Sequence, residues 1–441
     1  MSSICLYFHV HQPWRIKRYK VFDVGHDHRY FDGHNDPSVD NVAILKKVAE
    51  KCYLPTNRVL LELLRTHPEF KFSFSFSGVL IEQLEIHAPH VLESFRELVK
   101  TGRVEIVGET YYHSLAFIFN KEEFVEQVDL HRKKIKQVFG YVPTAFRNTE
   151  LIYRNDLAPI VDELGFSSVL TEGWDPLLGW RSPNFLYAPP NGSNVKIFTK
   201  NYRLSDDIAF RFSSRVWKEW PLTVEKYAQW VNAINGNGHV VNLFMDYETF
   251  GEHQWEDTGI FHFLRALPNE LLKHPDNDFE TISQAAVHYP AVGEYDVPNL
   301  LSWADTERDV SAWIGNSMQQ EALHKLYAIR DSVMQTGDAQ LIEDWRRLST
   351  SDHFYYMCTK WFADGDVHKY FSPYNTPYEA FIAFNNVMRD VEYRLTHLDE
   401  EPEEIEKAPR ARKATKKKVA TKKTTAKKVT KKKVAKKKVT S

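Results

Sequence analysis

The sequence has few cysteines and no long apolar run. Its 441 residues include three cysteines, Cys5, Cys52 and Cys358, which lie far apart and lack the spacing of a metal site. No window of about 18 uninterrupted apolar residues occurs, which argues against a transmembrane helix. The first residues, MSSICLYFHVHQP, lack the basic and apolar regions of a signal peptide. We therefore expect a cytoplasmic protein with reduced, buried cysteines and no membrane association.

Acidic and aromatic residues are missing from the end of the chain. Residues 407–441 contain 17 Lys and Arg but no Asp, Glu or aromatic residue, whereas residues 1–406 hold 40 basic and 59 acidic residues. Such a segment cannot bury enough apolar surface to offset chain entropy, so we predict an acidic linker and a disordered Lys-rich tail over residues 399–441. The acidic body repels phosphates, so contact with nucleic acid or another polyanion is expected in the tail. A tail without a specific partner, or one that folds back on the acidic body, stays open as an alternative.

Strand-like and helix-like segments alternate over the first half of the chain. The clearest strand pattern is FKFSFSFSG, in which Phe recurs at every second position from residue 70 to 76. Several predicted helices end in glycine, at Gly102, Gly140 and Gly165. Alternation of this kind predicts a parallel α/β sheet, and seven strands favour a barrel over an open sheet. The predicted strands are residues 4–10, 70–78, 104–112, 144–153, 167–173, 195–202 and 239–248.

The pattern changes after the last of these strands. The aromatic, Pro- and Gly-rich residues 171–194 predict a long loop over the top of the barrel. From residue 258 the apolar residues recur at three- and four-residue spacing, which predicts helices. We therefore predict a barrel domain over residues 1–257 and a helical domain over residues 258–398 that packs on it.

Ionisable residues follow five of the predicted strands. In a barrel of parallel strands the carboxyl ends meet at one face, where active sites lie. These side chains are therefore expected to converge on one polar, aromatic-lined pocket. His9 and His11 lie two residues apart, so on a strand both point to the same face. The ionisable residues at the strand ends are His9, His11, Glu109, His113, Glu150, Glu172, Asp246 and Glu248.

Paired carboxylates with aromatic walls are typical of glycoside chemistry. One carboxylate attacks the anomeric carbon, while a second carboxyl, kept protonated at a raised pKa, donates a proton to the leaving oxygen. Histidine and glutamine side chains suit hydrogen bonds to sugar hydroxyls. The sequence alone leaves open which carboxylates meet, because they are far apart in the chain.

Five segments, taken in order, resemble the five motifs of glycoside hydrolase family 57. They are HQP at 11–13, VEIVGETYYH at 104–113, AFRNTELIY at 145–153, FMDYETFGEH at 244–253 and WADTERDVSAWIGN at 303–316. Three residues such as HQP recur by chance, but the ordered set is specific. Residues 1 to about 395 resemble the α-amylase-like branch of that family.

The resemblance implies an incomplete, seven-stranded (β/α) barrel and a retaining mechanism on α-1,4-glucans with no metal or other cofactor. By motif position, Glu150 is the expected nucleophile and Asp246 the expected general acid/base, with the raised pKa on Asp246. His9, His11, His113 and Glu248 are expected to line the subsite of the attacked sugar. Trp303 and Asp309 are expected to be brought in by the helical region, and Glu109 and Glu172 to support the site.

Two other functions fit parts of the sequence. A metal-dependent polysaccharide deacetylase can use a related barrel, with His9, His11 and Asp246 as metal ligands. A non-catalytic glucan-binding protein with a nucleic-acid-binding tail is the second alternative. Within the leading hypothesis, hydrolysis and transfer to a sugar hydroxyl share the first step, and the sequence predicts neither one over the other. The sequence also does not predict the oligomeric state.

Overall fold

The fold is taken from a computed structural model, which describes residues 2–360 and 367–397. Residues 1–398 form one compact unit. The predicted boundary after residue 257 stays a prediction. The acidic linker and Lys-rich tail lie outside the described residues, so their predicted disorder and partners also stay predictions. Among the described residues, no helix combines the length and apolar character needed to cross a bilayer.

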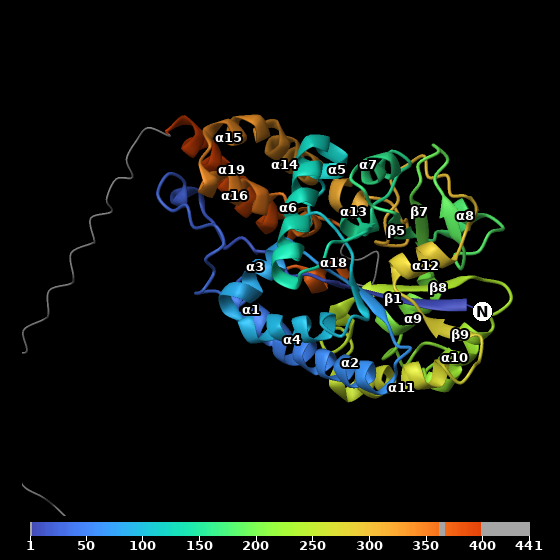
Figure 1. Cartoon of the computed structure of the whole chain (residues 1–441). Helices are drawn as coiled ribbons and strands as arrows, with labels where there is room; N and C mark the ends of the chain where they lie inside the picture. Colours follow the sequence, from blue (N-terminus) through green and yellow to red (C-terminus); the bar gives the residue numbers. More distant parts are fainter. Residues whose placement is uncertain (1, 361–366, 398–441) are drawn as a thin grey trace, which may run out of the picture. The chain divides into compact units, whose positions relative to one another are not determined.

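Seven parallel strands form the centre of the fold, as predicted (Figure 1). One sheet runs β3–β2–β1–β8 and the other contains β4, β5 and β7 side by side. Backbone hydrogen bonds of 2.8 Å from Gly108 to Ala145 and from Arg147 to Gly108 join β3 to β4. At the other seam, Asn201 donates to Asn242 at 2.9 Å between β7 and β8, which belong to separate sheets. The strands are β1 (Ser2–Val10), β2 (Phe72–Phe76), β3 (Val104–Ile106), β4 (Ala145–Arg147), β5 (Ser168–Glu172), β7 (Lys196–Lys200) and β8 (Val240–Asp246).

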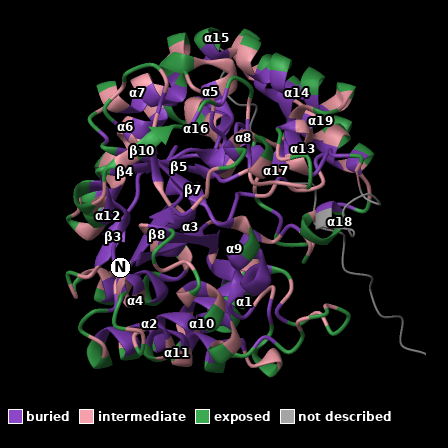
Figure 2. Cartoon of the chain, turned by 90° about the vertical axis from the view of Figure 1, so that its right-hand side faces the viewer, coloured by how far each residue is buried: buried purple, intermediate pink, exposed green. Residues whose placement is uncertain are grey.

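Side-chain alternation divides each strand between the barrel interior and the surrounding helices. Along β1, Phe8 and Val10 face outward into the core shared with the helices, whereas Cys5 and Tyr7 face inward. The Phe-Ser alternation of β2 places its phenylalanines in the outer core, and Ser75 turns inward to Tyr7, with 2.6 Å between the hydroxyl oxygens. Figure 2 shows the strands buried at the centre and the exposed residues on the outer faces of the helices. The period-two pattern of the sequence is therefore the pattern of inside and outside.

Helices cover the outside of the barrel. All three predicted glycine stops adopt the left-handed conformation typical of helix ends, with φ of 73° at Gly102, 68° at Gly140 and 81° at Gly165. The longest helix of this layer, α6, begins at Asn120, whose side chain accepts a hydrogen bond from the backbone N–H of Glu123. The helices are α1 (Asn41–Val48), α2 (Leu54–Thr66), α3 (Gly78–His87), α4 (Pro89–Val99), α5 (Ala116–Phe119), α6 (Lys121–Phe139), α7 (Leu157–Glu163), α9 (Tyr202–Ala209), α10 (Val224–Asn232), α11 (Ile260–Leu271) and α12 (Ile282–His288).

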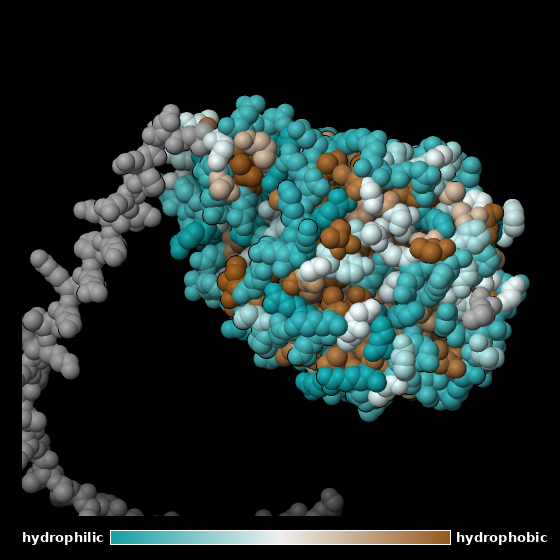
Figure 3. Space-filling view, viewed as in Figure 1, coloured by the Kyte–Doolittle hydropathy of each residue, from teal (hydrophilic) through white to brown (hydrophobic). Residues whose placement is uncertain are grey.

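The C-terminal helices gather at one end of the compact unit, where Figure 1 shows α14, α15, α16 and α19 together. Apart from α18 (Val367–Phe371), their apolar faces pack with the outer faces of β4, β5 and β7 in one continuous core cluster, which includes Trp313 and Trp345. The face seen in Figure 3 is mainly hydrophilic, with separate apolar patches. These helices are α13 (Ser311–Ile314), α14 (Ser317–Ala328), α15 (Arg330–Thr336), α16 (Ala339–Leu348), α17 (Ser351–Tyr355), α18 (Val367–Phe371) and α19 (Pro377–Thr396).

The fold differs from the prediction in its short elements. Residues 171–194 are not one long loop, because α8 (Asp175–Leu178) and β6 (Leu186–Ala188) lie within them. β6 runs antiparallel to β7, and β10 (Ala291–Glu294) pairs with β6. β9 (Asn277–Phe279) pairs with the start of β1 inside the stretch predicted to be helical. These strands have three or four residues, too few to show a period of two, and tertiary pairing defines them.

Candidate active site

A cavity of about 580 Å³ opens at the carboxyl ends of the barrel strands. Its size lies within the usual range for a small-molecule site. The barrel contributes most of its wall, and the C-terminal region adds Trp303, Asp305, Asp352 and Phe371. All of the predicted catalytic and substrate-binding residues except Asp309 line it: His9, His11, His113, Glu150, Asp246, Glu248 and Trp303. Glu109 and Glu172, which were predicted to support the site, are fully buried and do not line it.

Strand register explains why the polar groups form one layer. Cys5, Tyr7 and His9 alternate along the inner face of β1, and the last of them is at the cavity. The residues of β8 that pair with them are Asn242, Phe244 and Asp246. Beyond the seam next to β8, Glu172 at the end of β5 pairs with Lys200 at the end of β7. An apolar barrel core therefore ends in a layer of ionisable groups, as predicted from the strand ends.

Backbone strain is concentrated around this cavity. Five non-glycine residues of the described chain have positive φ, and four of them line the cavity: His113, Glu150, Asp305 and Arg308. The fifth, Leu151, follows Glu150, so two consecutive residues adopt the left-handed conformation. The Ser302 hydroxyl holds this turn by donating to the backbone carbonyl of Glu150 at 3.0 Å. Strained residues of this kind persist where the surrounding structure fixes them, which is common at functional sites.

The turn aims the Glu150 carboxylate at two hydrogen-bond donors. His113 Nε2 lies 3.0 Å from Oε1, and the Trp303 indole N–H donates to Oε2 at 2.7 Å. Burial of the Glu150 carboxyl works to raise its pKa, but the hydrogen bonds and the positive charges of His113 and Arg147 outweigh burial and lower it. Glu150 is therefore held as a carboxylate, the form that a nucleophile requires.

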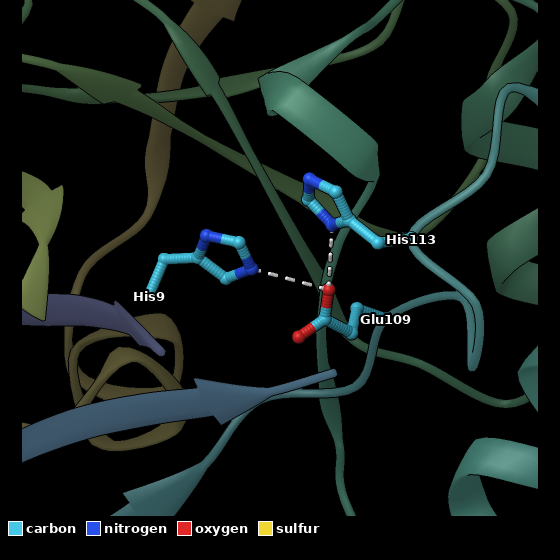
Figure 4. A group of neighbouring side chains, drawn as sticks. All are labelled: His9, Glu109 and His113. Atoms are coloured by element: carbon cyan, nitrogen blue, oxygen red, sulfur yellow. Dashed lines mark hydrogen bonds and ion pairs between the residues drawn. The ribbon is translucent and has the colours of Figure 1, made fainter. Parts of the chain in front are cut away.

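His113 is the centre of a buried charge network. His113 Nδ1 lies 3.3 Å from Glu109 Oε2. Burial works to lower the pKa of His113, but the hydrogen bonds of the ring to Glu109 and Glu150 outweigh burial and raise this pKa to about 9. A protonated His113 donates from both nitrogens, one to each carboxylate. Figure 4 shows the Glu109 carboxylate between the rings of His9 and His113. The Arg147 guanidinium lies 3.6 Å from the same carboxylate and neutralises it further.

Three imidazoles stack along this side of the cavity. The His9 and His113 ring centroids lie 4.8 Å apart, and those of His11 and His113 lie 4.2 Å apart. His11 Nε2 lies 3.0 Å from Asp352 Oδ2, and its Nδ1 lies 2.6 Å from the Ser77 hydroxyl. Burial and the neighbouring His113 lower the pKa of His11 to about 4, so His11 is neutral at physiological pH, with both nitrogens engaged by protein groups at the cavity wall.

Asp246 lies beside this stack, with its Oδ1 3.4 Å from His9 Nδ1 and its side chain 39% exposed. Burial works to raise its pKa, but the hydrogen bond and charge of His9 outweigh burial, so the pKa is lowered. The prediction that Asp246 carries the raised pKa is therefore wrong for the free protein. Sequence reasoning could not place the His9 ring against this carboxylate.

The raised pKa belongs to Glu248 instead. Burial, and then repulsion from Asp246, raise the pKa of Glu248 to about 8. The Tyr53 hydroxyl donates to its Oε1 at 2.5 Å, and the Gln12 amide approaches the same atom at 3.5 Å. Glu248 is thus a neutral carboxylic acid at pH 7, held in the cavity wall as a hydrogen-bond donor.

Asp309 is the exception among the predicted residues. It is exposed, and its carboxylate accepts hydrogen bonds from the backbone N–H and hydroxyl of Ser311. The chain reverses before it, with positive φ at Asp305 and Arg308, so those two residues line the cavity while Asp309 does not. The lining residues that were not predicted include Lys200, Asp305 and Asp352. Arg147 does not line the cavity and acts on it through Glu109 and His113. Asp352 lies in α17 of the C-terminal region, and only tertiary packing brings it to the barrel.

Two clusters in the cavity have metal-ligand composition, namely His9, Glu109 and His113, and His11, His113 and Asp352. Both need His113 as a neutral ligand, but its two nitrogens face Glu109 and Glu150, which stabilise the protonated ring. The Arg147 guanidinium, 3.3 Å from His113 Nδ1, already supplies positive charge to the first cluster. The donor set therefore fits a protonated imidazole better than a metal ion.

The family model described as "Glycosyl hydrolase family 57" matches residues 5–298 of the chain. A protein of Methanocaldococcus jannaschii named "Putative alpha-amylase" is 44% identical over 402 residues, which are 89% of this chain and 84% of that protein. An α-amylase of Pyrococcus furiosus is 28% identical over 49% of this chain and 32% of its own length.

Solved structures of low identity share the fold. A family 57 branching enzyme of Thermococcus kodakaraensis matches with a TM-score of 0.62 at 15% identity, over 84% of this chain and 87% of its own. The α-amylase AmyC of Thermotoga maritima matches with a TM-score of 0.59 at 12% identity, over 91% of this chain and 94% of its own. The extent of the family match and the identity to the Methanocaldococcus protein together confirm the resemblance found in the five motifs: the chain belongs to glycosyl hydrolase family 57 and is a glycoside hydrolase by class.

Proposed function

We propose that this protein cleaves α-1,4-glucans with retention of configuration. The observation that carries the proposal is that Glu150 and Asp246, from strands on opposite sides of the barrel, line one cavity and are connected through the stacked rings of His113 and His9. The similarity to proteins named α-amylases and 4-α-glucanotransferases supports an α-glucan as substrate.

The proposed reaction has two displacements. In the first, the Glu150 carboxylate attacks the anomeric carbon while Asp246 gives its proton to the glycosidic oxygen, so one sugar leaves and a glycosyl ester forms on Glu150. In the second, Asp246 takes a proton from water or a sugar hydroxyl, which attacks the same carbon and frees Glu150. Water yields hydrolysis, and a sugar hydroxyl yields transfer.

The low pKa of Asp246 in the free protein sets a condition on this scheme, because the acid must carry a proton. Burial is already the strongest influence on that pKa. A bound glucan covers the exposed part of the side chain and removes water from it, which strengthens the effect of burial and raises the lowered pKa of Asp246. Asp246 is thus expected to gain its proton in the substrate complex. Glu248, which is already protonated, would meanwhile donate a hydrogen bond to a sugar hydroxyl.

Product analysis with maltooligosaccharides tests this function. The wild type should convert maltoheptaose to shorter glucans, and it should also form longer glucans if transfer competes with hydrolysis. The kcat/KM of Glu150→Gln should be at least about 10³-fold lower than that of the wild type. Turnover by Glu150→Gln equal to that of the wild type would point to another nucleophile, and no turnover by either protein would favour the non-catalytic binding alternative.

A further inference from the structure

A second hollow lies beside the catalytic cavity. It is formed by α9, the chain that follows it and α10, and its wall includes Tyr202, Asp207, Arg211, Trp217, Glu219 and Trp230. α9 lies against β8, since the Ser205 hydroxyl accepts from the backbone N–H of Phe244 at 3.2 Å. The hollow is therefore built on the same wall of the barrel that carries Asp246.

Two contacts place this hollow next to the cavity. Arg211 lines both. Tyr202 lines the hollow and Arg308 lines the cavity, and the Arg308 guanidinium lies over the Tyr202 ring, 5.2 Å from its centroid. Phe210, next to Arg211, is 58% exposed and also belongs to the cavity wall. A chain-like ligand that leaves the cavity at this wall meets the hollow next.

The hollow has the chemistry of a sugar site. Trp217 and Trp230 meet edge to face, with centroids 6.2 Å apart, and both pack against the barrel core, which fixes their orientation. Rigid aromatic rings combined with a few polar groups are typical of sites for ligands that have apolar faces and polar edges. A pyranose ring has this character.

The charges of the hollow favour a neutral ligand. Arg203 pairs with Asp175 at 2.6 Å, and Arg211 forms an ion pair with Asp207. Lys218 and Glu219 add one charge of each sign. Positive groups that are matched by carboxylates give no net attraction for phosphate, so a nucleic acid or phosphorylated ligand is disfavoured.

We propose that this hollow is a distal subsite that binds the part of an α-glucan chain extending out of the catalytic cavity. The inference rests on the proposed function, which it deepens by giving the enzyme a preference for long chains. Trp217 would stack on a sugar ring, held in place by its edge-to-face contact with Trp230, and Arg203 and Glu219 would exchange hydrogen bonds with the hydroxyls of that ring. These residues do not touch the reacting atoms.

The test compares long and short substrates. Trp217→Ala should lower the ratio of kcat/KM for maltoheptaose to that for maltotriose roughly tenfold, which corresponds to about 1.4 kcal/mol of binding. Trp180→Ala is the matched control, because Trp180 is 95% exposed and lines neither the hollow nor the cavity. A ratio equal to that of the wild type in a folded Trp217→Ala variant would overturn the proposal.

Two further measurements separate this proposal from the proposed function and from misfolding. The first is the affinity for maltoheptaose, measured by calorimetry on Glu150→Gln with and without Trp217→Ala, which needs no turnover. A tenfold loss of affinity in the double variant supports the subsite, and an equal affinity overturns it. This result holds even if the wild type cleaves no glucan. Should Trp217→Ala unfold, Arg203→Ala tests the same hollow, since that side chain is 73% exposed. A reduced maltoheptaose preference is then expected, and an unchanged one contradicts the proposal.

Discussion

The Trp303 indole N–H donates to Glu150 Oε2 at 2.7 Å, from a segment more than 150 residues later in the chain. The Trp303 ring itself contacts two cations, with Lys200 Nζ 5.2 Å and the Arg147 guanidinium 5.4 Å from its centroid. The C-terminal region thus contributes directly to the ionisation and orientation of the proposed nucleophile.

Trp303→Phe should shift the pH profile as well as lower activity. Removing the donor takes away one of the influences that lower the pKa of Glu150, so that pKa rises and the acidic limb of kcat/KM moves to higher pH. The pH profile of the variant measures this shift. An acidic limb that stays in place while kcat falls would assign Trp303 to substrate contact alone; Trp180→Phe serves as control.

His113 should make stability depend on alkaline pH. Its pKa rises from 6.5 to about 9 on folding, so the stabilisation is full below pH 6.5 and is lost as pH increases toward 9. The free energy of unfolding of the wild type, minus that of His113→Gln, should therefore shrink between pH 6.5 and 9. Denaturant titrations at several pH values measure it. A difference that stays constant with pH would mean that His113 is not protonated in the folded protein. The control is His34→Gln, a substitution of an exposed histidine.

Asp246→Asn should reduce kcat/KM by roughly 10²–10⁴-fold, because proton donation to the leaving oxygen is lost. A glucoside with an activated aryl leaving group should lose less in its first step, since that group leaves without protonation. Asp309→Asn is the matched control and should retain wild-type activity, because Asp309 lies outside the cavity. Equal losses for both leaving groups would argue against Asp246 as the acid.

Prolonged dialysis against a chelator should leave glucan turnover unchanged. The nitrogens of His113 are engaged by carboxylates that keep the ring protonated, which removes the ligand common to both candidate metal clusters. Residual activity after dialysis is the measurement. A loss that Zn²⁺ restores would instead revive the metal-dependent deacetylase hypothesis.

Part of this site could be predicted because it follows from strand periodicity. His9, Glu150 and Asp246 stand at the ends of strands that meet at one face of a parallel barrel, and the motif resemblance added Trp303. Arg147 and Asp352 could not be found in this way, because an inward-facing arginine and a residue on a C-terminal helix become site residues only through packing. The pKa order of Asp246 and Glu248 depends on the His9 imidazole beside Asp246 and on the burial of Glu248, neither of which any spacing reveals. Asp309 was misplaced because two consecutive reversals of the backbone were not visible in its motif.

The central claim is that Glu150 and Asp246 act across one sugar, with Glu150 forming the covalent bond. For a retaining pair, the two carboxyl groups should lie about 5 to 5.5 Å apart. The most direct measurement is peptide mass mapping after incubation with a fluorinated α-glucosyl fluoride, which slows release of the glycosyl ester. We expect the added glycosyl mass on the peptide that contains Glu150. Turnover that leaves no adduct and releases the inverted β-anomer, or an adduct on a different carboxylate, would contradict the claim.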